Sequence, residues 1–464
     1  MDCALLWFRD DLRLADNPAL QDLLRLGLAP VPVYIHHPQG EGEWAPGAAS
    51  DAWRARSLRA LDAELRARGS RLQVLRGDPA MLLPRLAAAA GARAVRWNRR
   101  YEPAAEARDA GIKRALRADG VDARSHNGAL LFEPWQVATQ AGDPYKVFTP
   151  FWRAALQQWR LPAPAEAPAS LPAPPALDGA LDPEALVLAP RLGWDRGFWD
   201  RWTPGEAGAR AALEAFVAGA LDGYGERRNV PGVRGTSRLS PHLHFGEIAP
   251  WRVARRLQGE GPAGDRDAYV RELGWREFGY HLLHHFPHTP DSNFNPRFDD
   301  FPWAEPDPAA LEAWRRGRTG IPIVDAGMRE LWHTGWMHNR VRMIAGSLLT
   351  KHLRAHWRHG ARWFWDTLVD ADLANNTLGW QWVAGTGADA SPYHRVFNPV
   401  LQAQKFDPDG AYIARWVPEL AGLPPAQRHA PWTGVPPKGY PRPVVDLARG
   451  REQALAALAA IRKG

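Results

Sequence analysis

The sequence predicts a two-domain protein in which an α/β domain with a parallel, Rossmann-like sheet precedes an all-α domain. Short apolar runs alternate with helical patterns over residues 1–130, prolines crowd residues 161–190, and the pattern is helical from about residue 200 onward. Strand–helix alternation at this spacing is typical of right-handed crossovers between parallel strands. We therefore expect an α/β domain at 1–130, a Pro/Ala-rich interdomain linker at 131–200 and a helical domain at 201–464.

The first domain has five apolar runs that are typical of strands. The predicted strands span residues 3–8, 29–37, 71–77, 92–100 and 121–126. Apolar residues at spacings of three and four, with a glycine at the end, predict helices between them at 17–27, 50–69, 78–91 and 103–120. No G-x-G-x-x-G follows the first strand, so the dinucleotide fingerprint is absent, but the carboxyl edge of such a sheet still offers a ligand crevice.

The rest of the chain divides into a linker and helices. Residues 161–190 contain eight prolines and predict an extended linker without a regular element. Strand-like runs are scarce after it. The predicted helical segments span 205–221, 249–258, 266–286, 324–335, 339–360 and 361–369.

Composition limits the classes of function. Lys and Arg exceed Asp and Glu by 58 to 51, which suits a polyanionic partner or reflects an Arg-rich composition. The 23 tryptophans exceed what a core usually needs, and indoles stack on bases and flat cofactors. The single cysteine, Cys3, excludes an intramolecular disulfide and a Cys-based metal site and fits a reducing cytosol. We find neither a run long enough to cross a bilayer nor a targeting segment.

Two segments have residue patterns suited to a ligand. In GTSRLSPHLHFGEI (235–248), loop N–H groups, hydroxyls and a helix N-terminus could hold an anion, although a plain N-cap at Ser240 explains the pattern equally well. In RELGWREFGYHLLHH (271–285), Glu272 and Trp275 share a helix face and could receive a flat heterocycle. An amphipathic helix with Trp in the core is the simpler alternative. The histidines lack an HExxH pattern, so we expect no metal.

Two further segments add polar groups. Asn339, Arg342 and Met343 recur at helical spacing in TGWMHNRVRMIAG and could line a polar pocket, or simply be a surface Arg and a core Met. In DADLANNTLGWQWVAGTG (370–387), the first two aspartates could accept from a ligand or an Arg, and the second asparagine could face a redox-active ring nitrogen. The alternative is an Asp N-cap and an Asn-rich turn.

Seven motifs resemble the photolyase/cryptochrome family, and they occur in order along nearly the whole chain. They are WFRDDLRLADNPAL (7–20), GTSRLSPHLHFGEI (235–248), ELGWREF (272–278), GIPIVDAGMREL (320–331), TGWMHNRVRM (334–343), DADLANNTLGWQW (370–382) and SPYHRVFNP (391–399). Within the family the sequence is most similar to the photolyases that repair cyclobutane pyrimidine dimers in DNA. The resemblance implies an all-α C-terminal domain that binds FAD, with reduced FADH⁻ as the active form.

The resemblance also implies roles for individual residues. Those that match cofactor contacts are Tyr224, Thr236, Ser237, Arg238, Leu239, Ser240, Arg342, Asp370, Ala371, Asp372 and Asn376, the last expected at the flavin N5. Those that match catalytic positions are Glu272, Trp275, Asn339, Met343 and Asn376, with a flipped-out dimer expected against Glu272, Trp275 and Met343. Those that match DNA contacts are Arg228, Glu272, Trp275, Arg340 and Arg395.

Electron transfer and light harvesting complete the implied features. Trp380, Trp357 and Trp303 match a chain of tryptophans that reduces the flavin in light, although Trp303 matches only after a shift of one residue. Tyr269 stands where the family often has Trp. Glu106, in RRYEPAAEARD, resembles the contact to an antenna chromophore. That antenna would be methenyltetrahydrofolate or a deazaflavin, and some members bind none.

The expected activity is light-driven repair of cyclobutane pyrimidine dimers, a carbon–carbon lyase reaction on UV-damaged DNA. We expect a monomer without membrane attachment in the bacterial cytoplasm, at the nucleoid when it is bound to DNA. The alternatives are a cryptochrome-type blue-light photoreceptor, a photolyase for the (6-4) photoproduct, and a light-independent DNA-binding module without flavin.

Overall fold

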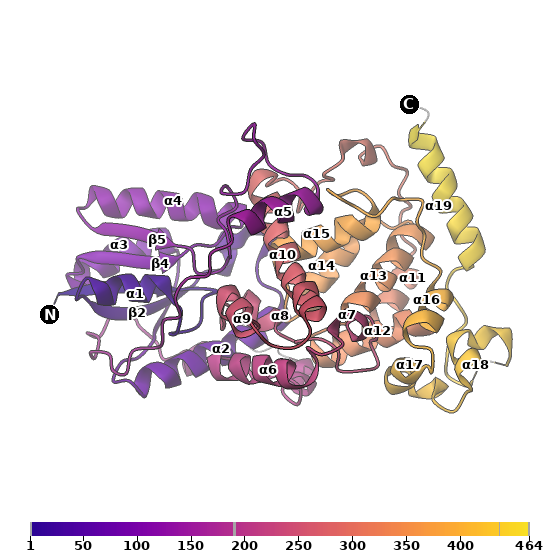
Figure 1. Ribbon diagram of the computed structural model, residues 1–464, viewed down its shortest axis with the longest axis horizontal. Helices are drawn as coiled ribbons and strands as arrows, with labels where there is room; N and C mark the ends of the chain where they lie inside the picture. Colours follow the sequence, from indigo (N-terminus) through magenta and orange to yellow (C-terminus); the bar gives the residue numbers. More distant parts are fainter. Residues whose placement is uncertain (1, 189–191, 436, 463–464) are drawn as a thin grey trace.

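Five parallel strands form the sheet at the start of the chain, at the left of Figure 1. The computed structural model describes residues 2–188, 192–435 and 437–462. The strands are β1 Cys3–Phe8, β2 Ala29–His36, β3 Gln73–Arg76, β4 Ala94–Asn98 and β5 Asp122–His126, in the order β3-β2-β1-β4-β5. Each predicted strand, and the parallel sheet that they form, is therefore confirmed.

Helices cover both faces of this sheet. They are α1 Pro18–Arg25, α2 Ala48–Arg66, α3 Pro79–Ala90 and α4 Pro103–Ala118, with the 3₁₀ turn η1 Pro38–Trp44 before α2. Side chains alternate along β1: Leu6 and Phe8 pack in one buried cluster with residues of α1 and α2, whereas Leu5 and Trp7 pack in another with residues of α3 and α4. This alternation follows from the period of two of a β-strand. Because all the strands are parallel, their carboxyl ends meet at one edge of the sheet.

The predicted linker, residues 131–200, contains structure that the sequence did not indicate. Helix α5 (Phe148–Gln157) packs Phe148 and Phe151 against Phe278 of the next domain. Two 3₁₀ turns, η2 Pro183–Ala185 and η3 Trp194–Phe198, follow. The described part of the proline-rich stretch is otherwise extended, as predicted, while residues 189 and 190 lie outside the described residues.

The second domain is helical, as predicted, and fills the right of Figure 1. Its first helices are α6 Glu206–Gly219, α7 Tyr224–Arg227, α8 Ser240–His244, α9 Pro250–Arg256, α10 Ala263–His285, α11 Pro308–Arg315 and α12 Pro322–Thr334. They are followed by α13 Asn339–Ser347, α14 Trp357–Thr367, α15 Leu373–Ala384, α16 Pro399–Phe406, α17 Ala411–Trp416, α18 Pro425–His429 and α19 Leu447–Arg462. Short 3₁₀ turns lie at η4 Pro296–Phe298, η6 Pro418–Leu420 and η7 Pro431–Thr433. No helix in the described ranges combines the length and apolarity needed to cross a membrane.

The predicted division between the helical segments 339–360 and 361–369 was wrong. Helix α13 passes into a π-helical turn, η5 (Leu348–His352), and then stops, and α14 begins at Trp357 and runs through the predicted boundary. Arg354 lies in the left-handed region with φ of 52°, and the side chain of His356 caps α14 by accepting from the N–H of Arg358. A side-chain cap and one left-handed residue therefore outweigh the helical spacing.

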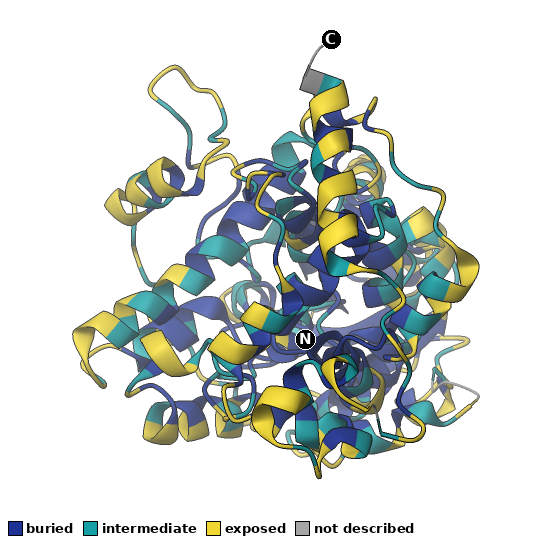
Figure 2. Ribbon diagram, turned by 90° about the vertical axis from the view of Figure 1, so that its right-hand side faces the viewer, coloured by how far each residue is buried: buried dark blue, intermediate teal, exposed yellow. Residues whose placement is uncertain are grey.

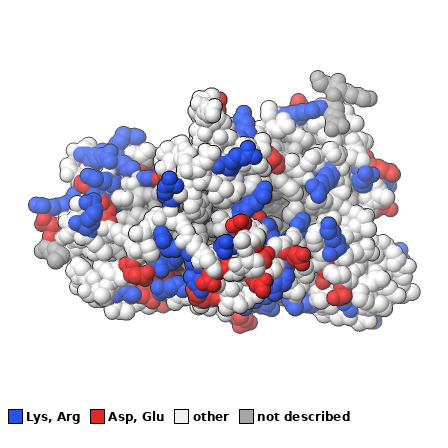
Figure 3. Space-filling model, in the orientation of Figure 1, with Lys and Arg blue, Asp and Glu red and all other residues white. Residues whose placement is uncertain are grey.

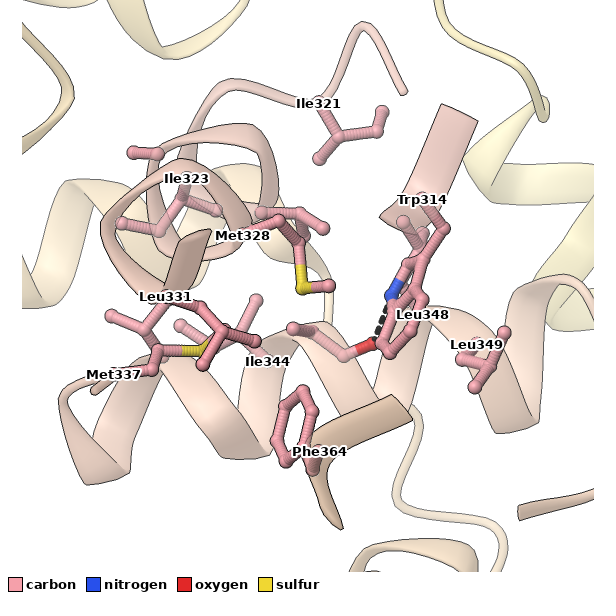
Figure 4. Packing of buried hydrophobic residues seen from close by; sticks show 14 of the residues in the cluster. Trp314, Ile321, Ile323, Met328, Leu331, Met337, Ile344, Leu348, Leu349 and Phe364 are labelled. Carbon is pink, nitrogen blue, oxygen red and sulfur yellow. Dashed lines mark hydrogen bonds between the residues drawn. The ribbon is translucent and has the colours of Figure 1, made fainter. Parts of the chain in front are cut away.

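A large apolar core holds the second domain together. Figure 4 shows Trp314 of α11, Met328 of α12, Ile344 of α13 and Phe364 of α14 pointing toward one another. The indole N–H of Trp314 donates to the carbonyl of Ala345 at 3.1 Å, so this deeply buried polar group is satisfied. These helices are therefore fixed relative to one another.

The motif at residues 7–20 joins the two domains. The buried guanidinium of Arg13 donates to the carbonyls of Gly246 and Gly128, each at 2.7 Å, and the N–H of Leu12 donates to the carbonyl of Phe245 at 3.0 Å. The Trp53 indole donates to the buried carboxylate of Glu247 at 2.9 Å. A Cβ at Gly246 would lie 2.3 Å from the Asp10 carbonyl, so only glycine permits this close approach.

Candidate functional site

The loop before α8 has the shape of an anion cradle. Arg238 has φ of 59°, and the N–H groups of Thr236, Ser237 and Arg238 donate to no protein acceptor within the described ranges. Consecutive free N–H groups beside a left-handed residue form a concavity that binds anions. The N-cap alternative for Ser240 was wrong, because α8 begins at Ser240 and has no side-chain cap.

Aromatic rings surround this loop. Tyr269 of α10 donates to the Ser237 hydroxyl at 2.9 Å and packs edge-to-face on Tyr224 of α7 at 5.2 Å. The Trp336 indole donates to the Ser240 hydroxyl at 3.3 Å, and the Arg238 guanidinium lies 3.9 Å from the Trp336 ring. Burial lowers the pKa of Arg238, and none of the described carboxylates forms an ion pair with it. An anion in the cradle would compensate this charge. Leu239 is buried beneath the loop.

Polar groups between α13 and α15 continue the site. Arg342 donates twice to Asp370, at 2.8 and 3.0 Å, and once to the carbonyl of Met337 at 2.7 Å. Asp370 thus has an Arg partner, one of the options that its sequence left open. Ala371, which follows it, is buried. Arg342 also lies 5.8 Å from the Trp336 ring, which connects this pair to the loop before α8.

Asp372 is the N-cap of α15, so the capping alternative holds for this residue. Its carboxylate accepts from the Asn375 backbone and side chain and from the hydroxyl of Tyr280, and it lies 3.8 Å from the His244 ring. Burial alone would raise the pKa of Asp372, but His244 and Arg276 hold it well below the ordinary value. Asp372 therefore stays ionised as an acceptor. Asn376 donates to the Ala361 carbonyl at 3.0 Å.

Glu272 and Trp275 both have partners. Glu272 forms an ion pair with Arg228 at 2.6 Å, with about a third of its side chain exposed (32%). The Trp275 ring stacks on Phe148 of α5, with centroids 3.8 Å apart and planes 8° apart. One face of Trp275 is thereby covered by a residue of the missed helix α5. Glu272 is not simply in solvent, as the amphipathic-helix alternative proposes.

An open groove with a volume of about 770 Å³ lies beside α13. It brings together the predicted residues Met343, Arg340 and Arg395 and adds Trp382, which sequence reasoning missed. Asn339 is exposed at the start of α13 and lies 4.0 Å from the Met343 sulfur. Figure 3 shows Lys and Arg spread across the viewed face, including its left end, with acidic side chains mainly in its lower half. Trp382 is the last residue of the motif DADLANNTLGWQW (370–382), so that motif was the sequence signal from which its role could have been predicted.

Other groove residues carried no sequence signal. Lys405 and Phe406 of α16 and Arg451 of α19 also line the groove, and they lie in none of the seven motifs. A phosphate contact needs only a cation in the right place, so local sequence gives it no signature.

The three predicted electron-transfer tryptophans are arranged along α14. Trp303 lies 5.1 Å from the His356 ring, which lies 5.4 Å from Trp357. Trp380 packs against the same helix one turn later, where a Cβ at Gly360 would lie 1.9 Å from its ring. Trp357 and Trp380 are buried, and Trp303 is half-buried. The His356 ring thus lies between Trp303 and Trp357, and Trp380 packs against the same helix, α14.

The sheet edge and the Glu106 surface are separate places. The crevice at the carboxyl edge, lined by Trp7, Tyr34 and Arg54, has a volume of only about 40 Å³. Glu106 instead contacts His284 at 3.1 Å, and the His284 ring lies 5.3 Å from Trp135, which is 47% exposed. Within the described residues, no three potential ligands are grouped so that they could hold a metal ion.

The donor set fits a dinucleotide in the helical domain. Free N–H groups suit a pyrophosphate, Asp372 can accept from a ring N–H, and the Arg342–Asp370 pair supplies both signs of charge. The fold and the site thus define a two-domain protein with an α/β domain and a helical, dinucleotide-binding domain.

Comparison with known proteins agrees with this description. Residues 4–173 match the family model described as DNA photolyase, and residues 269–460 match the FAD binding domain of DNA photolyase. A deoxyribodipyrimidine photo-lyase of Agrobacterium fabrum is 47% identical over 99% of this chain and 98% of its own length. The crystal structure of a bacterial class III photolyase from Agrobacterium tumefaciens superimposes with a TM-score of 0.94 and 46% identity, covering 100% and 98% of the two chains. Cryptochrome-1 of Arabidopsis thaliana is 36% identical over 96% of this chain and 68% of its own length. The chain belongs to the photolyase/cryptochrome family.

Proposed function

We propose that this protein is a deoxyribodipyrimidine photo-lyase that uses light and reduced FAD to split cyclobutane pyrimidine dimers in DNA. Relatives of that name match the whole chain at high identity, which supports the proposal. The observation that carries it is the double role of α13. Arg342 faces Asp370 on the cofactor side, whereas Arg340 and Met343 line the groove. A bound cofactor and bound DNA would thus be separated by about the width of one helix.

The chain would hold FAD through three groups of residues. The N–H groups of Thr236, Ser237 and Arg238 would bind the pyrophosphate, with Tyr224, Leu239 and Ser240 beside them. Arg342, Asp370 and Asp372, with Ala371 between the aspartates, would bind polar edges of the flavin, and the amide of Asn376 would face N5. When bound, reduced FAD supplies a light-excitable electron donor. Protein groups orient it and exclude water.

The DNA side would receive a dimer that has left the stack. Flipping is least costly for a damaged base pair, because pairing is already weakened. Glu272 would stabilise the charge that develops on the carbonyl edge of the dimer through a shared proton, and Arg228 fixes its carboxylate. The free face of Trp275, together with Met343 and Trp382, would give the dimer an apolar surface. Asn339, Arg340 and Arg395 would meet polar groups of the damaged strand.

Two features extend this proposal. Trp380, Trp357 and Trp303 would carry an electron inward, and the rings between Trp303 and Trp357 support this. Glu106 would contact an antenna such as methenyltetrahydrofolate, because its surface offers an exposed indole whereas the sheet crevice is too small for a deazaflavin. We also propose that the protein acts as a monomer in the bacterial cytoplasm, at the nucleoid when bound to DNA.

The alternatives within the family are less favoured. A cryptochrome-type receptor needs no lesion site, yet Met343 lines the groove and Glu272 is held in an ion pair with Arg228. A (6-4) photolyase is expected to have a histidine pair by the lesion, and Met343 occupies one of those places. A flavin-free DNA-binding module would give a colourless protein.

A light-dependent assay tests the proposal. The purified protein should show flavin absorption, and it should restore a thymine-dimer oligonucleotide in blue light but not in darkness. Glu272→Ala should lower the repair yield of bound dimer by about ten-fold, equivalent to about 1.4 kcal/mol, while Glu272→Gln should retain most of it. Equal repair in light and darkness would refute the function. Full yield from Glu272→Ala would remove only the role of that residue.

A further inference from the structure

We infer that the C-terminal helix α19 forms part of the DNA interface and that Arg451 on this helix binds a backbone phosphate. The inference rests on the proposed function, because it names a further part of the same DNA site. Arg451 lines the groove that also contains Arg340, Arg395 and Lys405, although it lies more than a hundred residues after α13 in the chain. None of the family motifs includes it.

The charge of the groove indicates the kind of partner. Four cationic side chains line it, and among the residues that the structure describes no Asp or Glu does so. Arg451 is exposed, and none of the described carboxylates lies within ion-pair distance of its guanidinium. A groove with four like charges and no counter-charge is costly to maintain without an anion nearby. A polyanion with regularly spaced charges, such as a nucleic-acid backbone, relieves this repulsion.

The other cations of the groove are held in position by aromatic rings. The Arg340 guanidinium lies 4.4 Å from the Phe406 ring, and the Lys405 ammonium lies 5.3 Å from the same ring. The Arg395 guanidinium lies 5.8 Å from Phe397. An aromatic face attracts a cation without neutralising its charge, so these groups remain free to bind phosphate.

Helix α19 is firmly attached, so Arg451 is not part of a loose tail. Figure 2 shows an exposed outer face and a buried inner face on this helix. Ala454, Ala457 and Leu458 pack with Phe298, Phe301 and Tyr393. At the far end, Arg297 donates to the Ile461 carbonyl at 3.0 Å. Gly450 packs closely on His352, where a Cβ would lie 3.1 Å from the backbone.

The N-terminal end of α19 is not itself the phosphate site. The carboxylate of Asp446, directly before the helix, accepts from the N–H of Arg449 at 2.9 Å, so this end already has an acidic cap. Arg451 is the fifth residue of α19 and lies beyond the first turn, where the helix dipole acts most strongly. The uncompensated charge of the groove, rather than the helix end, therefore favours a phosphate at Arg451.

The same helix supplies a matched control. Arg449 is exposed on α19, two residues before Arg451, and does not line the groove. Arg451→Gln and Arg449→Gln remove the same charge from the same helix. Binding to a duplex with one thymine dimer would be measured in darkness by fluorescence anisotropy, at KCl concentrations from about 50 to 300 mM. Thermal melting of both variants checks that the fold is intact.

We expect Arg451→Gln to weaken binding three- to ten-fold and to reduce the slope of log K against log [salt] by about 0.9, the value for one phosphate contact. The loss should be equal for undamaged duplex, because a phosphate contact does not read sequence. Arg449→Gln should bind like the unchanged protein. Equal effects of the two variants, or no effect of Arg451→Gln, would overturn the inference. Weaker binding of Arg451→Gln to an RNA duplex, combined with unchanged binding to the DNA duplex, would also overturn the inference.

Failure of this inference and failure of the proposed function would give different results. Repair in blue light with unchanged binding by Arg451→Gln would overturn the role of α19 alone. Absence of light-dependent repair, combined with a reduced salt slope in Arg451→Gln, would overturn the repair function and leave the DNA interface intact. The repair yield per bound dimer should be the same in Arg449→Gln and in the unchanged protein, because Arg449 does not line the groove.

Discussion

The sheet-edge crevice and the groove beside α13 are both rich in arginine, but among the described residues only the crevice arginines have carboxylate partners. In the crevice, Arg54 pairs with Asp10 at 2.6 Å, and Arg100 pairs with Glu41 at 2.8 Å as well as with Asp10 and Glu102. In the groove, Arg340 and Arg395 form no ion pair with any carboxylate that the structure describes. Carboxylates of the protein itself thus balance the charges of Arg54 and Arg100 in the crevice. Arg340 and Arg395 in the groove have no such partner among the described carboxylates.

The pKa values follow this difference. Burial alone would lower the pKa of Arg54 and of Arg100, but nearby carboxylates, led by Asp10 and by Glu102 respectively, raise both. Burial, together with the charges of Arg228 and Arg395, lowers the pKa of Arg340. A count of arginines therefore does not identify a nucleic-acid site. The absence of a counter-charge among the described residues, which only the folded structure reveals, distinguishes the groove from the crevice.

The crevice should respond most strongly to loss of one charge. The Arg54 and Asp10 side chains are both about nine-tenths buried, and Asp10→Asn would remove the one described carboxylate within ion-pair distance of Arg54. We expect the free energy of unfolding to fall by about 3 kcal/mol, because an unpaired buried charge is costly. Urea denaturation measures this change, and DNA affinity at low denaturant should stay the same.

A double variant provides the control for Asp10→Asn. Adding Arg54→Met removes the unpaired charge and should recover at least half of the lost stability. A double variant no more stable than Asp10→Asn would show that the crevice is held by packing rather than by charge pairing.

The sequence predicts the two regions unequally. All five strands follow from apolar runs and their spacing, because a parallel sheet imposes a local pattern. The cradle residues Thr236 to Ser240 lie in one contiguous motif, so that part of the site could be predicted from the sequence. Helix α5 and the break at residues 353–356 could not be predicted, because tertiary contacts and one left-handed residue determine them. Lys405 and Arg451 reach the groove from separate helices, so no local pattern marks them.

Lys351 is a third case, which is buried like the crevice arginines but unpaired like the groove cations. It is 1% exposed, and its ammonium donates to the Tyr393 carbonyl at 2.8 Å. Burial lowers its pKa to about 7. Since the unfolded value is about 10.4, the native protein favours the neutral amine. Stability is therefore fully present above pH 10.4 and is lost as the pH falls toward 7.

The test of Lys351 is a stability profile against pH. The free energy of unfolding should rise by roughly 1 kcal/mol per pH unit between about pH 7 and pH 10, and this slope should be smaller by that amount in Lys351→Met. Chemical denaturation at four pH values measures both proteins. Parallel profiles would mean that the native protein stabilises the charged form of Lys351, so that Lys351 would not differ from the crevice arginines.

A groove cation should affect binding without affecting stability. Arg395→Gln should weaken binding to dimer-containing duplex by about ten-fold, equivalent to about 1.4 kcal/mol, and reduce the salt slope by about 0.9. Its unfolding midpoint should stay within error, because its exposed side chain forms no ion pair with a described carboxylate. Anisotropy titrations and thermal melting measure the two quantities. A loss of stability matching that of Asp10→Asn would remove the distinction between the regions.

Phe406 gives the smallest and most selective test, because it carries no charge. Its ring lies under both Arg340 and Lys405, at 4.4 and 5.3 Å, so it positions two groove cations at once. Phe406→Leu keeps an apolar side chain but removes the aromatic face. We expect binding to weaken two- to five-fold, by about 0.5–1 kcal/mol, with the salt slope unchanged because both cations remain. Phe406→Tyr, which restores the ring, should restore affinity. A reduced salt slope in Phe406→Leu would show that a cation has left the groove. The ring would then determine whether the charges face the DNA at all, rather than how firmly they are held in place.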